Sequence, residues 1–333
     1  MSLWKPHFAS FPKRTTTHPT PMKTSIPSIL TAGATLFLGL HAAPVRADIL
    51  YVGDTTSPPD ILKFTSGGAS SVFANVPGGL NTPGSFAFDS AGNLFVGSIN
   101  ASAIQKITPA GVISTFVTTG AGQPFGIAFD AAGNLYAALN NLNTIAQYTP
   151  GGVSSVFASG LNNPLTVAFD SAGNLYTNDG ANTIERFTPG GIGSVFVSGT
   201  GVNSPRSLAF DLAGNLYVAN DADNTIEKFT IGGIGSVFAT SGVTHPTGIA
   251  FDSAGNLYVA NAGNNTIREF SSTGNDLGNF ASSGLHFPRP LAFTNDAGVP
   301  LPLANGYPVP ELATWALLGL GLPALLAFRR RKA

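Results

Sequence analysis

Residues 248–260 read GIAFDSAGNLYVA, and this stretch decides the fold of the protein. Its motif FDxAGNL, followed by Tyr or Phe, occurs five times along the chain. Consecutive copies lie 40 or 41 residues apart, and a fixed period of this length indicates a repeat architecture. The aspartates of the five copies are Asp89, Asp130, Asp170, Asp211 and Asp252, and a sixth, eroded copy begins at Phe293.

Each repeat predicts four short β-strands. GIAF at 248–251 and LYVA at 257–260 are apolar strands, and the DSAGN between them predicts a type I turn with a bulge, because Asp bonds its own backbone and Gly adopts positive φ. A third strand is expected at 266–270, and a fourth is clearest at 236–239. Pro-Gly within 149–152 predicts a type II turn between them. Four antiparallel strands without helix signals are typical of a propeller blade.

The ends of the repeat predict six blades. Five complete units have first strands that include Phe86, Ile127, Val167, Leu208 and Ile249. Three strands precede them, at 49–52, 61–64 and 71–74, and one strand follows them, at 290–293. We therefore expect an all-β, six-bladed propeller whose closing blade combines three N-terminal strands with one C-terminal strand, which removes open sheet edges. The recurring Phe and Tyr residues are expected to pack between blades.

Composition excludes several classes of protein. The 333 residues contain no cysteine, which excludes disulfides, cysteine-bound zinc and thiol nucleophiles. With 43% hydrophobic and 10% charged residues, the chain is not disordered. Residues 48–310 contain seven Lys or Arg and 16 Asp or Glu, a net charge of −9. Such an acidic domain repels nucleic acid, anionic lipid and acidic polysaccharide.

Residues 1–47 predict an N-terminal extension and a secretory signal. Lys23 provides a basic start, 26–40 is an apolar run, and small residues lead to a cleavage site after Ala47. Met22 is the expected start of translation. A transmembrane anchor is the alternative, and the shortness of the apolar run disfavours it.

The C-terminal segment, 309–333, predicts a single transmembrane helix with its basic end in the cytoplasm. The apolar run 316–328 follows a short polar motif and precedes an arginine cluster, and a linker is expected at 297–308, after a propeller at 48–296. The candidate signal residues are Val309, Pro310, Glu311, Trp315, Arg329, Arg330 and Arg331.

The order of motif, span and arginine cluster resembles the PEP-CTERM sorting signal, although Leu312 stands where that motif has a second proline. The resemblance implies export, anchoring in the inner membrane, and processing by an exosortase-type enzyme that delivers the protein to the cell surface or the extracellular matrix. A plain C-terminal anchor is the alternative.

The repeat unit PxG(I/L)AFDxAGNLYVAN resembles the NHL repeat, over 49–294, and the wider gluconolactonase-like and senescence-marker-like superfamily. That resemblance implies either a binding or scaffold propeller or a metal-dependent lactonase. The resemblance implies that a lactonase of this kind holds its metal with ligands that include a Glu on an early inner strand and an Asn just before the Gly of an inner-strand Asn-Gly pair. At the position of that Asn this chain has no asparagine: the residues there are Gly84, Phe125, Leu165, Arg206, Thr247 and Arg289.

The glutamates Glu185, Glu227 and Glu269 all fall in third strands, away from the axis. Virginiamycin-lyase-like propellers use His and Glu, whereas neither His245 nor His286 has a glutamate in its own loop. We therefore expect no metal, no cofactor and no catalytic residue. The repeated aspartates are interpreted as turn formers, with a calcium ring as the alternative.

Loops between second and third strands and loops between blades are expected to meet on one face, and loops often carry function. The predicted function is an exported, non-catalytic binding or scaffold propeller for a protein or polysaccharide at the cell envelope. The alternatives are solvated turn residues without a ligand, and a lactonase-like hydrolase or lyase with divergent metal ligands. The candidate binding residues are Phe125, Asn163, Asp179, Arg206, Asp221, Asp223, His245, Asn264 and Arg289.

Overall fold

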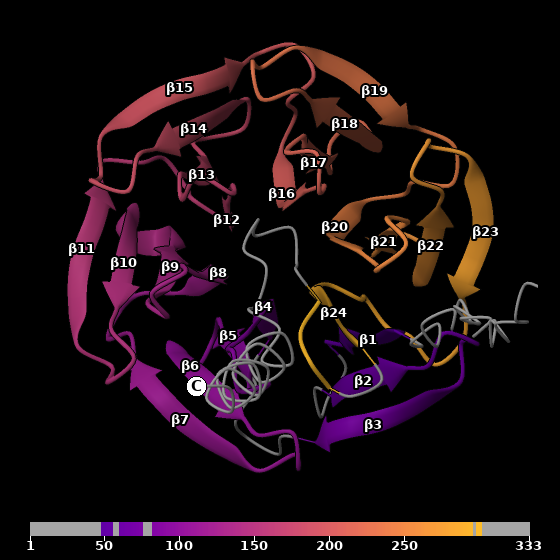
Figure 1. Cartoon of the computed structure of the whole chain (residues 1–333), viewed down its shortest axis with the longest axis horizontal. Coiled ribbons are helices and arrows are strands. Elements are labelled where there is room, and N and C mark those ends of the chain that lie inside the picture. Colours follow the sequence, from indigo (N-terminus) through magenta and orange to yellow (C-terminus); the bar gives the residue numbers. More distant parts are fainter. Residues whose placement is uncertain (1–47, 56–59, 76–81, 296–297, 302–333) are drawn as a thin grey trace, which may run out of the picture. The chain divides into compact units, whose positions relative to one another are not determined.

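A computed structural model describes residues 48–55, 60–75, 82–295 and 298–301. These residues form six antiparallel sheets of four strands, arranged as a ring around a central axis (Figure 1). The predicted signal segment 1–47 and the predicted sorting signal and transmembrane helix at 309–333 lie outside the described residues. No helix within the described ranges has the length and apolar character needed to cross a membrane.

Each blade begins with a strand next to the axis and ends with a strand at the perimeter (Figure 1). The closing blade contains β24 (Leu291–Asn295), β1 (Asp48–Gly53), β2 (Asp60–Phe64) and β3 (Ser70–Asn75). The second blade contains β4 (Pro83–Phe88), β5 (Leu94–Ser98), β6 (Ala103–Ile107) and β7 (Ile113–Thr118). The third blade contains β8 (Pro124–Phe129), β9 (Leu135–Leu139), the 3-10 turn η1 (Asn140–Leu142), β10 (Thr144–Tyr148) and β11 (Ser154–Ser159).

The remaining three blades have the same order. They contain β12 (Val167–Phe169), β13 (Leu175–Asn178), β14 (Thr183–Phe187) and β15 (Gly193–Ser198); β16 (Pro205–Phe210), β17 (Leu216–Asn220), β18 (Thr225–Phe229) and β19 (Gly235–Ala239); and β20 (Pro246–Phe251), β21 (Leu257–Asn261), β22 (Thr266–Phe270) and β23 (Asp276–Ala281). The predicted number of blades and of strands per blade is confirmed.

The ring closes through the predicted pairing of the two ends of the repeat region. Strands β1 and β24 pair antiparallel, in a register that runs from Asp48 opposite Asn295 to Val52 opposite Leu291. Beyond the strand end, Arg289 N donates to the carbonyl of Gly53 at 3.0 Å. Strand β24 therefore covers β1, and the closing blade has the same four strands as the other five blades.

The hydrophobic core is divided into six clusters, one between each pair of neighbouring blades. In every interface the aromatic ring of a second strand packs edge to face against two phenylalanines. Tyr217, for example, lies 4.9 Å, between ring centroids, from Phe238 of its own blade and from Phe251 of the next blade. This edge-to-face geometry is favoured by aromatic rings. The predicted packing role of the repeated aromatic residues is confirmed.

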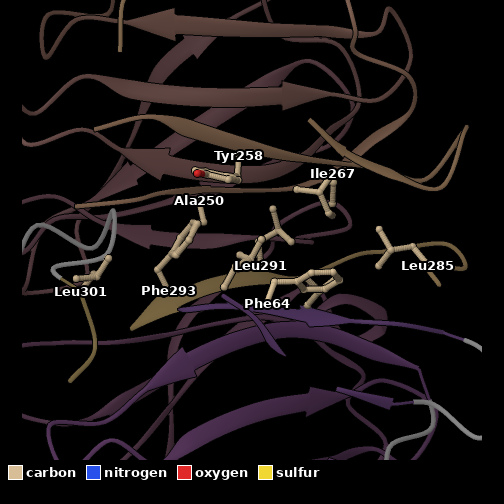
Figure 2. Close-up of a cluster of buried hydrophobic side chains, with 11 residues drawn as sticks. Phe64, Ala250, Tyr258, Ile267, Leu285, Leu291, Phe293 and Leu301 are labelled. Carbon is tan, nitrogen blue, oxygen red and sulfur yellow. The ribbon is translucent and has the colours of Figure 1, made fainter. Parts of the chain in front are cut away.

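Figure 2 shows the cluster that joins the closing blade to its neighbour. Phe293 of β24 lies 4.9 Å, between ring centroids, from Tyr258 of β21, and Phe64 of β2 is buried in the same cluster. Leu301, which falls in the predicted linker 297–308, is also buried here. Burial of one such side chain stabilises the fold by about 1.5–3 kcal/mol, so this interface holds the ends of the ring together.

The DxAGN turns are built as predicted. In the turn after β16, Asp211 Oδ1 accepts the backbone N–H groups of Ala213 (3.0 Å) and Asn215 (2.8 Å), and Asn215 Nδ2 donates to Asp211 Oδ2 at 2.7 Å. Gly214 has a φ of 82°, the conformation that favours glycine. The other four copies make the same three bonds.

The predicted type II turn at 149–152 is wrong. A type II turn needs positive φ at its third residue, Gly151, but the positive φ of 83° is at Gly152. Gly152 N donates to the carbonyl of Thr149 at 2.8 Å, and Thr149 N donates to the carbonyl of Val153 at 2.9 Å. A type I turn followed by a left-handed glycine matches the twist of the flanking strands, and it is the same solution that the DxAGN turns use.

Candidate functional site

The two ends of the innermost strands define two faces of the ring. Strand β16, for example, begins at Pro205 and ends at Phe210, directly before the turn of Asp211. We call the end with the DxAGN turns the turn face, and the end with the prolines the pocket face. The loops between second and third strands and those between blades meet on the pocket face, as expected.

Buried asparagines at the ends of second strands hold the loops of the pocket face. The side chain of Asn220, which is fully buried, accepts the N–H of Asn203 at 3.0 Å and donates to the carbonyl of Gly201 at 3.0 Å. Asn261 makes the equivalent bonds in the next blade. Both amides are satisfied inside the protein, so they position the loops and are not available to a ligand.

In each blade a proline lies at or just before the start of the innermost strand, and we call it the inner-strand proline. The residue before it adopts a left-handed conformation in most blades. Thr82, Asn163, Ser204, His245 and Phe287 have φ between 47° and 67°. The N–H of His245 donates to Asn224 Oδ1 at 2.6 Å, and Asn265 Oδ1 accepts the N–H of Phe287 at 2.7 Å. These bonds from the preceding blade hold a conformation that costs non-glycine residues energy, and they fix His245 and Phe287 at the axis.

The pocket face contains a cavity of about 320 Å³ at the axis. The residue after the inner-strand proline lines it in all six blades, so each blade contributes one wall position. These wall residues are Gly84, Phe125, Leu165, Arg206, Thr247 and Arg289, and the remaining lining residues are Asp221, His245, Ala262, Gly263 and Phe287.

One part of the cavity wall is a charged cluster. Arg206 Nε donates to Asp221 Oδ2 at 3.1 Å, and His245 Nδ1 lies 3.0 Å from Asp221 Oδ1. The side chain of Asp221 is 20% exposed, whereas those of Arg206 and His245 are 41% and 61% exposed. The carboxylate therefore orients an arginine and a histidine that both remain accessible to a ligand.

Arg289 lies in the same wall, and among the described residues it forms no ion pair. Its Nε is buried and has no hydrogen-bond partner in the described part of the chain. Its guanidinium lies 5.0 Å from the ring centroid of Phe287, a cation–π contact. Burial, and then the charge of Arg206, lowers the pKa of Arg289, and the charge of Asp221 opposes that shift.

The rest of the wall is apolar and tightly built. Phe125 and Leu165 are half-buried, and the ring of Phe287 is exposed. The innermost strands approach closely here: a Cβ at Gly84 would lie 2.7 Å from the carbonyl oxygen of Phe125, and a Cβ at Gly248 would lie 1.8 Å from that of Arg289. Glycine is needed at these positions because backbone fills the space that a side chain would take.

The structure brings five of the nine predicted binding residues together in this cavity: Phe125, Arg206, Asp221, His245 and Arg289. The other four lie elsewhere on the pocket face. Asn163 lines an adjoining hollow with Asn140 and Asn178, and this hollow shares Phe125, Leu165 and Arg206 with the axial cavity. Asp179 accepts the N–H of Asn162 at 2.5 Å. Asp223 and Asn264 accept the hydroxyls of Thr225 and Thr266 within their own turns.

Sequence reasoning missed Leu165, Thr247 and Phe287 as cavity residues. The signal that could have found Leu165 and Thr247 is the proline before each of them, since the position after every inner-strand proline lines the cavity. Phe287 occupies the place before a proline, the same place as His245. The pairing of His245 with Asp221 joins two blades and gives no local signal in the sequence.

A divalent metal of the lactonase kind does not fit this wall. Of the six wall positions, two carry guanidinium groups and two carry apolar side chains, none of which binds a cation. Among the described residues that line the cavity, Asp221 is the one carboxylate, and Arg206 and His245 already engage it. Throughout the described ranges, no three His, Asp or Glu side chains gather closely enough to hold a metal ion.

Comparisons with known proteins agree with this architecture. Residues 244–270 match the NHL repeat, and no curated protein matches the chain. A chain of the nidogen/laminin complex is similar in structure, with a TM-score of 0.66 and 19% identity over 74% of this chain and 98% of that chain.

Two enzymes are also similar. A catalytically inactive virginiamycin B lyase from Staphylococcus aureus with quinupristin has a TM-score of 0.58 and 18% identity, over 72% of this chain and 85% of its own. A gluconolactonase from Xanthomonas campestris has a TM-score of 0.56 and 17% identity, over 63% of this chain and 82% of its own. Together with the repeat match, these likenesses define a six-bladed β-propeller that contains an NHL repeat.

Proposed function

We propose that this protein is an exported, non-catalytic binding propeller that holds a protein or polysaccharide ligand on its pocket face at the bacterial cell envelope. The observation that carries the proposal is the axial cavity, whose walls offer accessible charged and apolar side chains but not the ligand set of a lactonase metal. The similarity to a chain of the nidogen/laminin complex supports a protein as partner.

Binding is tested by screening the purified protein against arrays of glycans and peptides. The expected result is retention of one class of ligand that is lost in the variant Phe125→Ser on the pocket face. The matched control is Leu212→Ser, because Leu212 is 86% exposed on the turn face. Equal retention by both variants would place the binding surface away from the cavity and overturn the proposal.

Export and sorting form a separate part of the proposal, supported by the sequence of 1–47 and 309–333. The protein is anchored in the inner membrane at first, and an exosortase-type enzyme then releases it to the cell surface. Intact-mass measurement of the protein from its native host should show that residues 1–47 and the cluster Arg329, Arg330 and Arg331 have been removed. Retention of the arginine cluster indicates a permanent anchor instead.

A second candidate function is a hydrolase or lyase, favoured by the pairing of His245 with Asp221. The carboxylate of Asp221 lies 3.0 Å from His245 Nδ1 and orients the imidazole ring, an arrangement that general-base catalysis also uses. Turnover of lactones, with and without Ca²⁺ or Zn²⁺, tests this alternative. Turnover that disappears in His245→Ala, or a metal-dependent rise in melting temperature, would favour the enzyme over the binding protein.

A further inference from the structure

The wall of the axial cavity is divided into a cationic side and an apolar side. The innermost strands follow one another around the ring in the order β4, β8, β12, β16, β20 and β24 (Figure 1). Arg206, Thr247 and Arg289 are therefore the wall residues of three consecutive blades, and Phe125 and Leu165 are those of two other consecutive blades. A ligand in the cavity therefore meets guanidinium groups on one side and carbon on the other.

The cationic side of the cavity has fewer carboxylates than guanidinium groups. Two of the seven Lys and Arg residues of 48–310 lie in this wall, and Asp221 is the one carboxylate that lines it. Asp221 accepts a hydrogen bond from Arg206 and lies within hydrogen-bond distance of His245. The buried Nε of Arg289 has no hydrogen-bond partner among the residues that the structure describes. A partly buried cation without a counter-ion is costly, and an anionic ligand removes that cost.

The charges and the size of the cavity restrict the anion. Two guanidinium groups and one carboxylate leave a net charge of about +1 when His245 is neutral, which favours a monoanion over a dianion that Asp221 would repel. A planar carboxylate matches the guanidinium fork. A volume of about 320 Å³ is at the small end for ligand sites and admits one aromatic or aliphatic group beside the carboxylate.

We propose that the axial cavity binds a monocarboxylate that carries an adjacent aromatic or aliphatic group, with the carboxylate on Arg289 and Arg206 and the apolar group against Phe125 and Leu165. This inference deepens the proposed function, because it rests on the pocket face as the binding face and names the chemistry recognised there. The carboxylate belongs either to a free organic acid or to the C-terminal residue of a peptide.

Calorimetric titration of the purified protein with 3-phenylpropionate tests the proposal, and 3-phenylpropionamide is the neutral control. We expect saturable binding of the acid and at least tenfold weaker binding of the amide, since a hydrogen bond to a charged group contributes that much. Acetyl-Gly-Gly-Phe with a free carboxylate distinguishes the sources: tighter binding than 3-phenylpropionate assigns a peptide C-terminus, and weaker binding assigns a free acid.

The variant Arg289→Met separates binding from folding. It should weaken binding of 3-phenylpropionate roughly tenfold to hundredfold while leaving the melting temperature unchanged or higher, because it removes a buried cation that lacks a counter-ion. Arg268→Gln is the matched control: Arg268 pairs with Asp276 at 2.6 Å at the outer edge of its blade, so its loss should not change the affinity.

Equal binding of acid and amide, unchanged affinity in Arg289→Met, or no saturable heat up to about 10 mM acid would overturn the inference. These outcomes are distinguishable from failure of the proposed function. A glycan or protein that is retained by the protein but lost in Phe125→Ser would preserve the binding function even if the carboxylate chemistry were wrong.

Discussion

The turn face and the pocket face are built from opposite ends of the same innermost strands, but their residues differ in how much they vary from blade to blade. On the turn face the same residues recur in five blades, and every repeated aspartate accepts the same three hydrogen bonds within its own turn. On the pocket face the position after the proline holds Gly, Phe, Leu, Arg, Thr and Arg. In this repeat protein, the positions that hold the same residue in every copy stabilise the turns, and the wall positions that differ between copies form the candidate site.

The largest expected effect tests how tightly the pocket face is built. Gly248→Ala places a Cβ 1.8 Å from the carbonyl oxygen of Arg289, so β20 and β24 must separate. We expect the free energy of unfolding in urea to fall by about 3 kcal/mol or more. Gly190→Ala is the control, because its Cβ would meet nothing nearer than Thr188 Oγ1 at 3.9 Å. Equal stability of the two variants would contradict the close approach of the innermost strands.

A turn-face aspartate should affect stability and not binding. Asp211→Ala removes the acceptor of three hydrogen bonds from Ala213 and Asn215, which should lower the free energy of unfolding by about 1–3 kcal/mol. Asp130→Ala should behave similarly, because Asp130 accepts the same three bonds in its own turn. Titration of either variant with 3-phenylpropionate should give the affinity of the parent protein. If either variant lost binding but kept its stability, the assignment of structure to the turn face and of binding to the pocket face would be contradicted.

The turn face should also lose stability in acid. Burial raises the pKa of Asp211, but hydrogen bonds from Asn215 and the charge of Lys228 outweigh burial and leave the pKa below its ordinary value of 3.8. The folded protein therefore holds this proton less tightly than the unfolded chain, so the stabilisation is complete well above that value and is lost as the pH falls through the folded pKa. Urea unfolding should show the advantage of the parent over Asp211→Asn shrinking from about pH 5 to about pH 2. A constant difference would contradict this origin of the stability.

The smallest expected change in stability is on the pocket face. Asp221→Asn removes the ion pair to Arg206 and the carboxylate that lies against His245. These two side chains are 41% and 61% exposed, so the free energy of unfolding should change by less than about 1 kcal/mol. Removal of the one carboxylate in the cavity should strengthen binding of 3-phenylpropionate by roughly two- to fivefold. Calorimetry and thermal melting measure the two quantities. Weaker binding in this variant would contradict the electrostatic account of the cavity.

Much of the fold could be predicted from the sequence because its signals are local. The spacing of the FDxAGN motifs, the strands before and after the complete repeats, and the recurring aromatics predict the blades, the closure and the interblade packing, all of which are confirmed. The turn at 149–152 was predicted wrongly, because Pro-Gly suits a type II turn locally, while the twist of the paired strands selects a type I turn with a left-handed Gly152.

The candidate site was predicted only in part. Phe125, Arg206 and Arg289 were predicted on the pocket face because each lies in a loop between blades, and the structure brings them together in the cavity. Asp223 and Asn264 have the same polar character as Asp221, but hydrogen bonds inside their own turns engage them. Composition alone does not separate an asparagine that positions a loop from one that faces a ligand, because both occur in the same loops.

A closed ring of six blades follows from the sequence, since each period contains its own strands, turns and interblade aromatics. The side chains that share a cavity become evident when the blades are packed around the axis. Residues from different blades converge at the axis, where Asp221 meets His245 of the next blade and the buried Nε of Arg289 has no hydrogen-bond partner among the described residues. The physical reason is that desolvation and unbalanced charge depend on what surrounds a side chain in space, and neighbours along the chain do not specify those surroundings.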